Sequence, residues 1–229
     1  MDVSGLFALK YALIRRQNPS IQKLLDRGAN INQIDNKGRN LLHHAINMSS
    51  ATADATFETE AFLIERGVDI NLRDQKNRTP LHYAFVKIQD WKNSIQIDPI
   101  ETVSSLCGCK GLEIDVQDKW LKTPLNYASQ RGASICAMYL AQRGASLESK
   151  DIYGNTPLGV GLMHSHYNYG IILIQKGASV HPLTFGEDPE RIKKQWEEEE
   201  KQKRALYRHQ KRGSKGKQQE DEEMKNADS

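Results

Sequence analysis

Short segments whose apolar residues share one helix face recur along the chain. Leu81 and Ala84 are three residues apart, so they lie on the same side of a helix that Thr79 caps and Pro80 opens. The string recurs as Thr123-Pro124-Leu125-Asn126-Tyr127-Ala128 and, less closely, as Thr156-Pro157-Leu158-Gly159-Val160-Gly161. The pattern therefore predicts short helices that begin at equivalent places in repeated units.

A second apolar stripe follows in each unit. Ile135, Tyr139 and Leu140 have the spacing of a buried helix face. The matching stripe near the end of the repeated region is formed by Ile171, Leu173 and Ile174. Two short helices cannot bury their apolar side alone, so we expect neighbouring units to stack and form the core together.

Two markers give the period of the units. An aspartate opens each unit, at Asp2, Asp35, Asp74, Asp118 and Asp151, with intervals of 33, 39, 44 and 33 residues. A glycine closes each predicted helix pair, at Gly28, Gly67, Gly111, Gly144 and Gly177, with intervals of 39, 44, 33 and 33 residues. The basic period is thus 33 residues, and two units carry 6 and 11 additional residues. We predict that these insertions lie between the two helices of a unit, around 47–56 and 87–99.

The period and two strings of residues resemble the ankyrin repeat family. The strings are Arg78-Thr79-Pro80-Leu81-His82-Tyr83-Ala84 and Arg27-Gly28-Ala29-Asn30-Ile31-Asn32. The resemblance covers residues 1–182 as five repeats, at about 2–34, 35–73, 74–117, 118–150 and 151–182. It implies an all-α repeat solenoid in which each repeat has a helix–turn–helix and a β-hairpin finger. It also implies that His82 hydrogen-bonds the backbone of the next repeat.

The fingers are candidate binding sites, because partners of this family usually contact them. We name residues 34–39, 73–78, 117–122 and 150–155 fingers 1 to 4. Of the sixteen positions that lie one before and one, two and four after each opening aspartate, eight are basic and none is acidic. The predicted partner-binding residues are Lys37, Arg39, Arg73, Lys76, Arg78, Lys119, Trp120, Lys122, Lys150, Ile152 and Tyr153.

Two aromatic residues are expected at equivalent fingertips. Trp120 and Tyr153 are 33 residues apart, and exposed aromatic side chains beside basic ones are typical of binding hot spots. The alternative is that Trp120 folds over a neighbouring finger. Leu121 stands where Gly38 and Gly154 stand in other fingers, so it is strained if this position requires a positive φ.

The composition changes after Pro182. Residues 183–229 contain 12 basic and 12 acidic residues, and we predict a charged helix from Asp188-Pro189 followed by a disordered tail. A basic cluster between Lys201 and Lys217 has two open interpretations: a nuclear-localisation or nucleic-acid segment, or a solvated charged helix.

The larger insertion, around 87–99, also has two open interpretations. We expect its Trp91, Ile95 and Ile97 either to pack against their own repeat or to bind a partner, and we favour the first interpretation.

Bulk properties of the 229 residues exclude several classes. The net charge of +3 is too small to identify a partner, and no apolar run is long enough for a membrane span. Cys107, Cys109 and Cys136 are odd in number, which favours free thiols in a reducing, nuclear or cytoplasmic, compartment. We expect buried packing of Cys107 and Cys136 rather than a metal site. Because phosphate-binding, metalloprotease and hydrolase motifs are absent, we expect neither a cofactor nor an enzyme within these residues.

The favoured function is a protein-interaction scaffold whose fingers bind an acidic segment with an apolar anchor. One alternative is nucleic-acid or poly-ADP-ribose binding through the fingers and the basic tail. Another is the targeting region of a larger nuclear enzyme, because residues 120–158 resemble ankyrin blocks that are joined to poly-ADP-ribose polymerases.

Overall fold

The computed structural model describes residues 3–48, 53–86 and 99–180. These residues form helices and turns, without a strand. The helices are α1 (Val3–Ile14), α2 (Asn18–Asp26), α3 (Leu41–Met48), α4 (Ala53–Glu65), α5 (Pro80–Tyr83), α6 (Ile100–Gly108), α7 (Pro124–Arg131), α8 (Ser134–Gln142), α9 (Pro157–Met163) and α10 (Tyr167–Gln175). The all-α repeat is thus as predicted, whereas the predicted β-hairpin fingers are turns in the described part of the chain.

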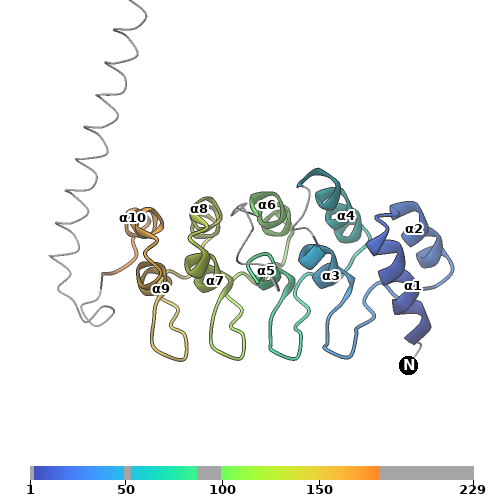
Figure 1. Ribbon diagram of the computed structural model, residues 1–229, viewed down its shortest axis with the longest axis horizontal. Coiled ribbons are helices and arrows are strands. Elements are labelled where there is room, and N and C mark those ends of the chain that lie inside the picture. The colour runs from blue at the N-terminus through green and yellow to red at the C-terminus, as the bar shows by residue number, and fades with distance from the viewer. Residues whose placement is uncertain (1–2, 49–52, 87–98, 181–229) are drawn as a thin grey trace, which may run out of the picture. The chain divides into compact units, whose positions relative to one another are not determined.

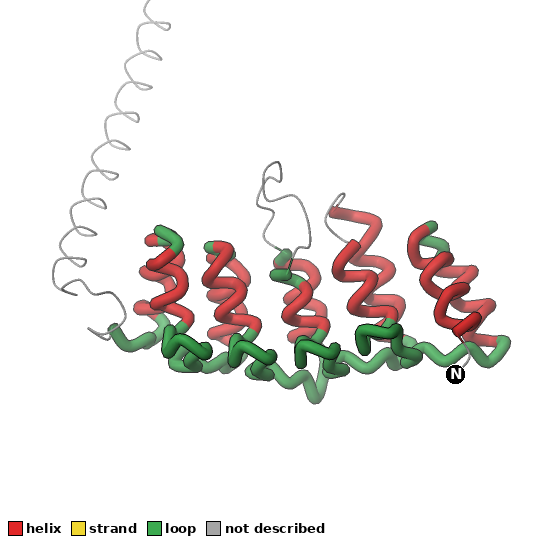
Figure 2. The backbone as a smooth tube through the Cα atoms, turned by 60° about the horizontal axis from the view of Figure 1, so that its bottom comes forward, coloured by secondary structure: helices red, strands yellow, loops and turns green. Residues whose placement is uncertain are grey.

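The helices stack as pairs in two rows (Figure 1). The first helices of successive repeats contact one another from α3 to α5, α7 and α9, and the second helices do so from α4 to α6, α8 and α10. The turns that precede the first helices project along one edge of this stack, as the loops in Figure 2 show. Residues one repeat apart, which is 33 to 44 positions between the opening aspartates, therefore become neighbours at that edge.

Two of the three helix starts follow the predicted capping pattern, whereas the Thr79 hydroxyl forms no side-chain cap hydrogen bond and lies 2.9 Å from Nδ1 of His82. The Thr123 hydroxyl accepts a hydrogen bond from the N–H of Asn126 at 3.3 Å, and Thr156 does the same for Gly159. A proline occupies the first turn of α5, α7 and α9. The closing glycines have the predicted left-handed backbone, with φ of 88° at Gly28.

The core consists mostly of small and aliphatic side chains, with Phe85 and Tyr169 as its largest fully buried members. Leu81, Leu125 and Leu158 at the helix starts are almost fully buried. In α8 the prediction for Ile135 is wrong, because this side chain is 52% exposed while Cys136, Ala137 and Leu140 are buried. Small residues at the contact let the helices approach closely. The buried face of α8 therefore begins at Cys136, one residue after the large apolar Ile135 on which the prediction was based.

Two histidines join successive repeats. The Nε2 atom of His43 lies 3.2 Å from the carbonyl oxygen of Arg78, and that of His82 lies 3.1 Å from the carbonyl oxygen of Lys122. The predicted role of His82 is confirmed. Burial lowers the pKa of both rings to about 4, so they are neutral near pH 7.

The next interface along the stack uses different groups. Asn126 occupies the place of His82, and its Nδ2 atom is buried with no hydrogen-bond partner among the described residues. The hydroxyls of Ser129 and Tyr169 are hydrogen-bonded instead, inside the core between α7 and α10. His166 also spans this interface, since its Nε2 lies 3.2 Å from the carbonyl oxygen of Gln130.

The chain separates into a compact unit, Met1–Val180, and a second unit, His181–Ser229. The predicted charged helix and tail fall in the second unit and lie outside the described residues. The same is true of Trp91, Ile95 and Ile97 in the larger insertion. The segment predicted as the smaller insertion contains the end of α3 and the start of α4.

Candidate functional site

Each finger is closed by its opening aspartate. In finger 2 the N–H of Asp74 donates to the carbonyl oxygen of Arg78 at 2.9 Å. The Oδ1 atom of Asp74 accepts from the N–H groups of Lys76 and Arg78 at 2.8 and 2.9 Å. Equivalent bonds close the fingers of Asp35, Asp118 and Asp151. An aspartate that accepts backbone N–H groups in this way stabilises a tight turn.

One backbone hydrogen bond joins each pair of neighbouring fingers, beside side-chain bonds from Gln75, Asn77 and Gln117 to backbone carbonyl oxygens. The N–H of the residue after each opening aspartate donates to a carbonyl oxygen of the preceding finger. These bonds join Gln75 to Lys37 at 2.9 Å, Lys119 to Lys76 at 2.9 Å and Ile152 to Trp120 at 3.0 Å. The predicted alignment of the fingers is therefore present in the described residues.

Part of the predicted site lies on the surface as one row. Lys37, Lys76, Lys119 and Lys150 are exposed on successive fingers. Beside Lys150, Ile152 is 47% and Tyr153 78% exposed. We name these six residues the finger row. It combines one positive charge per finger with an apolar end at finger 4.

The prediction that Arg78 binds a partner is wrong, because Arg78 is only 8% exposed. Its Nε and Nη2 atoms donate to Oδ2 of Asp74 at 2.9 and 2.6 Å, and Nη2 lies 2.9 Å from the hydroxyl of Tyr83. That hydroxyl also donates to Oδ2 of Asp74 at 2.8 Å. Arg78 thus stabilises its own finger and offers no free charge to a partner.

Arg39 has the same role in finger 1 and is also excluded from the predicted contact surface. Its Nε and Nη2 atoms donate to Oδ2 of Asp35 at 2.9 and 2.7 Å, and its side chain is largely buried. His44 lies 3.1 Å from the same oxygen. Burial raises the pKa of Asp35, but the hydrogen bonds from Arg39 outweigh it and hold this pKa far below its usual range.

The same balance applies to Asp74. Burial raises its pKa, whereas hydrogen bonds from Arg78 and Tyr83 lower it by more, so the carboxyl is ionised. Burial, together with the bond to Asp74, raises the pKa of Tyr83 to about 12, so this phenol keeps its proton. The network is a satisfied structural ion pair without a reactive group.

Two further basic residues are partly engaged. The Lys122 ammonium lies 3.3 Å from Oε1 of Gln130 and 5.6 Å from the ring centre of Tyr127. Arg73 is exposed and pairs with Glu113 at 2.8 Å. A surface pair of this kind is weak, so Arg73 can exchange Glu113 for a partner's carboxylate at little cost.

Trp120 and Tyr153 occupy equivalent fingertip positions, as predicted, since the N–H of each donates to Oδ1 of its aspartate at 2.9 Å, but their side chains differ in exposure. Trp120 is half-buried, and the ammonium groups of Lys119 and Lys76 lie 4.3 and 5.6 Å from its ring centre. Cation–π contacts of this type fix lysine side chains that would otherwise be free. Trp120 therefore positions two charges of the finger row, and Tyr153 is the exposed aromatic residue. Leu121 does have the expected positive φ, 56°.

Sequence reasoning missed the tyrosines beneath the fingers. Tyr83 and Tyr127 each stand nine residues after an opening aspartate, and the hydroxyl of Tyr127 donates to Oδ2 of Asp118 at 2.7 Å. In finger 4 this place is taken by Val160, and no described residue donates to Oδ2 of Asp151. The recurrence of a hydroxyl at this spacing was a usable signal.

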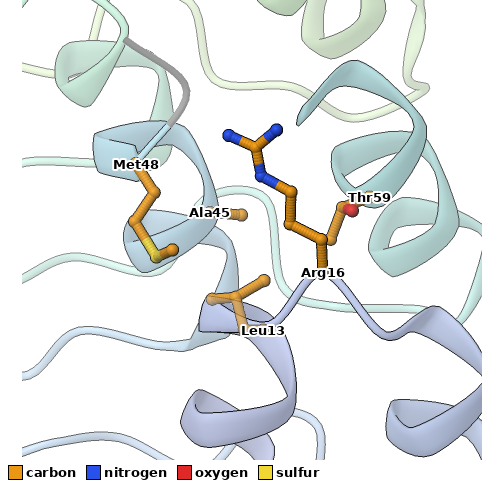
Figure 3. A pocket seen from close by; sticks show the side chains of 5 residues that line it. All are labelled: Leu13, Arg16, Ala45, Met48 and Thr59. Carbon is orange, nitrogen blue, oxygen red and sulfur yellow. The ribbon is translucent and has the colours of Figure 1, made fainter. Parts of the chain in front are cut away.

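Other features of the described residues are a small hollow, exposed apolar side chains of α1 (Phe7, Tyr11 and Ile14) and the cysteines. A hollow between α1, α3 and α4 is lined by Leu13, Arg16, Ala45, Met48 and Thr59 (Figure 3). Its volume of about 10 Å³ is close to the minimum for one water molecule. No cluster of metal ligands is found in the described part of the chain. Cys107 and Cys136 are buried, as expected, and burial raises the pKa of Cys107 to about 11.

A family model described as ankyrin repeats (3 copies) matches residues 9–91 and 92–183. The chain belongs to the ankyrin repeat family. Ankyrin repeats generally mediate protein–protein interactions and are generally not catalytic. Within the described residues, no helix of this ankyrin protein is both long and apolar enough to cross a membrane.

Two curated relatives are similar to parts of this ankyrin chain. One is poly [ADP-ribose] polymerase tankyrase of Caenorhabditis elegans, 28% identical over 158 residues, which are 67% of this chain and 7% of that protein. The other is potassium channel AKT2/3 of Arabidopsis thaliana, 32% identical over 76 residues, which are 33% of this chain and 10% of that protein. The chain thus matches no more than a tenth of either relative's length.

Proposed function

We propose that this ankyrin protein is an interaction scaffold whose finger row binds an acidic segment of a protein partner, with an apolar partner residue at finger 4. The observation that carries the proposal is that each of four successive fingers exposes a lysine, with Ile152 and Tyr153 exposed on the last of them. A reducing compartment, the nucleus or the cytoplasm, is part of the same proposal.

The spacing of the fingers determines the partner pattern. Packed helices lie roughly 10 Å apart, and an extended chain spans about 3.3 Å per residue. An extended partner therefore places one residue in every three opposite successive fingers. Acidic residues at that spacing, followed by an aromatic or aliphatic residue, would match the finger row.

A defined probe tests this proposal. A fluorescein-labelled peptide with glutamate at every third position and a phenylalanine near one end is titrated into the full chain, with fluorescence anisotropy as readout. The triple variant Lys37→Glu, Lys76→Glu and Lys119→Glu should weaken binding at least about a hundredfold, since each charge is reversed. The matched control is Lys23→Glu, Lys110→Glu and Lys176→Glu, which changes exposed lysines outside the fingers.

The outcome is read with stability as a check. Both triple variants should melt within a few degrees of the wild type, because exposed charges contribute little to stability. Equal binding of the peptide by the two variants would remove the finger row as the binding surface. Pull-down with the same proteins, followed by mass spectrometry, then identifies natural partners that require the row.

A second candidate is that this chain acts as the targeting region of a larger protein. The similarity to a poly [ADP-ribose] polymerase, of which the match covers only 7%, supports it. Sequencing the full-length transcript beyond the codon for Ser229 tests this candidate.

Nucleic-acid or poly-ADP-ribose binding predicts a steep loss of affinity with added salt, and a flat salt dependence would argue against it.

A further inference from the structure

The aspartates that open the four fingers differ in how their second carboxylate oxygen is satisfied. In every finger Oδ1 accepts two backbone N–H groups. Oδ2 accepts from Arg39 and lies beside His44 in finger 1, and it accepts from Arg78 and Tyr83 in finger 2. In finger 3 it accepts from the hydroxyl of Tyr127.

Finger 4 lacks all of these donors. Asn155 stands where Arg39 and Arg78 stand, and Val160 stands where the tyrosines stand. Asp151 is only 5% exposed, yet its Oδ2 accepts no hydrogen bond from a described residue. Lys122 does not compensate, because its ammonium is engaged by Gln130 and faces the ring of Tyr127.

Oδ2 of Asp151 is not among the buried side-chain oxygens that lack a hydrogen-bond partner in the described residues, so it keeps contact with solvent although the residue as a whole is largely buried. The turn itself does not need the missing donor, because Oδ1 alone accepts the N–H groups of Tyr153 and Asn155 at 2.9 and 3.0 Å. Oδ2 of Asp151 is therefore available for a group from outside the chain. It also lies in the finger that exposes Ile152 and Tyr153.

We propose that Asp151 is a specificity-determining residue that binds a cationic side chain, arginine or lysine, of the partner segment. The inference rests on the proposed function, because it assigns a direction to the partner on the finger row. Acidic partner residues lie over the four lysines of the finger row, and a basic residue lies beside the apolar one at finger 4, at Oδ2 of Asp151. A uniformly acidic segment would leave this carboxylate unpaired.

The first test uses two labelled peptides that differ in one side chain. Both carry the spaced glutamates and the phenylalanine, followed by arginine in one and by its neutral analogue citrulline in the other. The full-length wild type should bind the arginine peptide about tenfold more tightly. The ratio should fall to about one in Asp151→Asn, which keeps an oxygen for the two backbone N–H groups.

A second variant guards against misfolding of the first. Asn155→Arg provides an internal guanidinium at the position from which Arg39 and Arg78 reach their aspartates. It should keep or raise the melting temperature and also abolish the preference for arginine over citrulline. An unchanged preference in both variants would overturn the assignment of Asp151. Equal binding of the two peptides by the wild type would overturn it too, while leaving the finger row intact.

A small probe tests the subsite without the row. Nα-acetyl-arginine amide at millimolar concentration should give a saturable shift of the ¹³C resonance of the Asp151 side-chain carboxyl, and Nα-acetyl-citrulline amide should not. The shift should disappear in Asn155→Arg. If neither peptide binds but this shift is present, only the proposed function fails. If the two small probes behave alike, the Asp151 subsite fails.

Discussion

Fingers 2 and 4 have the same backbone turn but use it differently. In finger 2 the side chains of Arg78 and Tyr83 both reach Oδ2 of Asp74, and all three are buried. In finger 4 no described side chain reaches Oδ2 of Asp151, and the neighbouring Tyr153 is exposed. The same turn therefore serves internal stability in one repeat and presents unsatisfied groups in another.

The difference shows which residues determine whether a finger is stabilised internally or presents groups at its surface. The turn depends on Oδ1 of the aspartate and on the backbone, which are the same in both fingers. The residues four and nine positions after the aspartate determine whether its second oxygen is paired within the repeat. An arginine four positions after the aspartate is a structural residue in fingers 1 and 2, where Arg39 and Arg78 pair with Oδ2. Lys122 at the same place of finger 3 contacts Gln130 instead.

The largest expected effect is on stability. Arg78→Ala leaves the buried Asp74 without its guanidinium, so the free energy of unfolding should fall by about 3–5 kcal/mol. Asn155→Ala changes the matching position of finger 4, where the side chain makes no hydrogen bond to a described residue, and should cost at most about 0.5 kcal/mol. Urea denaturation measures both. Similar losses in the two variants would contradict the comparison.

The second effect is pH dependence in the repeat of finger 2. The folded pKa of His82 is about 4 against 6.5 for a free histidine. Between these values the unfolded chain binds a proton that the folded chain does not, so stability falls as pH decreases from about 6.5 to 4. The loss attributable to His82 approaches about 3 kcal/mol.

Denaturation at several pH values measures this slope. The variant His82→Asn carries the residue found at position 126. It should reduce the pH dependence of the free energy of unfolding by the contribution of His82, while the contribution of His43 remains. The repeat of finger 4 has no equivalent of this ring, because Gly159 occupies the matching place, but burial also lowers the pKa of His164 in that repeat. An unaltered slope in His82→Asn would show that the ring is not kept neutral by the fold. Aspartates 35 and 74 contribute separately at lower pH, since their folded pKa values are depressed.

The smallest effect concerns the left-handed residue of fingers 3 and 4. Leu121 has a φ of 56° and Gly154 a φ of 80°, and such a backbone costs a side chain about 1–2 kcal/mol. Leu121→Gly should therefore raise the free energy of unfolding by about 1 kcal/mol. Gly154→Ala should lower it by a similar amount, because open space surrounds the added methyl group and only the backbone is strained. A loss in both variants would mean that Leu121 packs favourably.

Much of the fold could be predicted because its determinants are local. Thr123 and Pro124 define a helix start through capping and a fixed φ, and Gly28 ends a helix through its left-handed backbone. The period of 33 residues then places equivalent residues side by side. Ile135 was misplaced because hydrophobic size does not reveal which face small residues such as Ala137 bring into contact.

The candidate site was predicted in part. Position after the aspartate identifies which residues lie on a finger, and Lys37 and Tyr153 are exposed as expected. Position does not show whether a long basic side chain extends into solvent or folds back on its own carboxylate. That choice depends on packing beneath the finger, and it moved Arg78 from the surface to the interior.

The bonds that join neighbouring fingers have a consequence for evolution. Beside side-chain bonds, such as that from Nδ2 of Asn77 to the carbonyl oxygen of Gln117, each pair of neighbouring fingers shares one bond between main-chain atoms, such as the N–H of Lys119 and the carbonyl oxygen of Lys76. Among single substitutions, only proline at the donor position deletes such a bond directly. Fingertip side chains can therefore be substituted while these main-chain bonds keep the spacing of the fingers. New partners can thus be acquired without a change of the backbone fold.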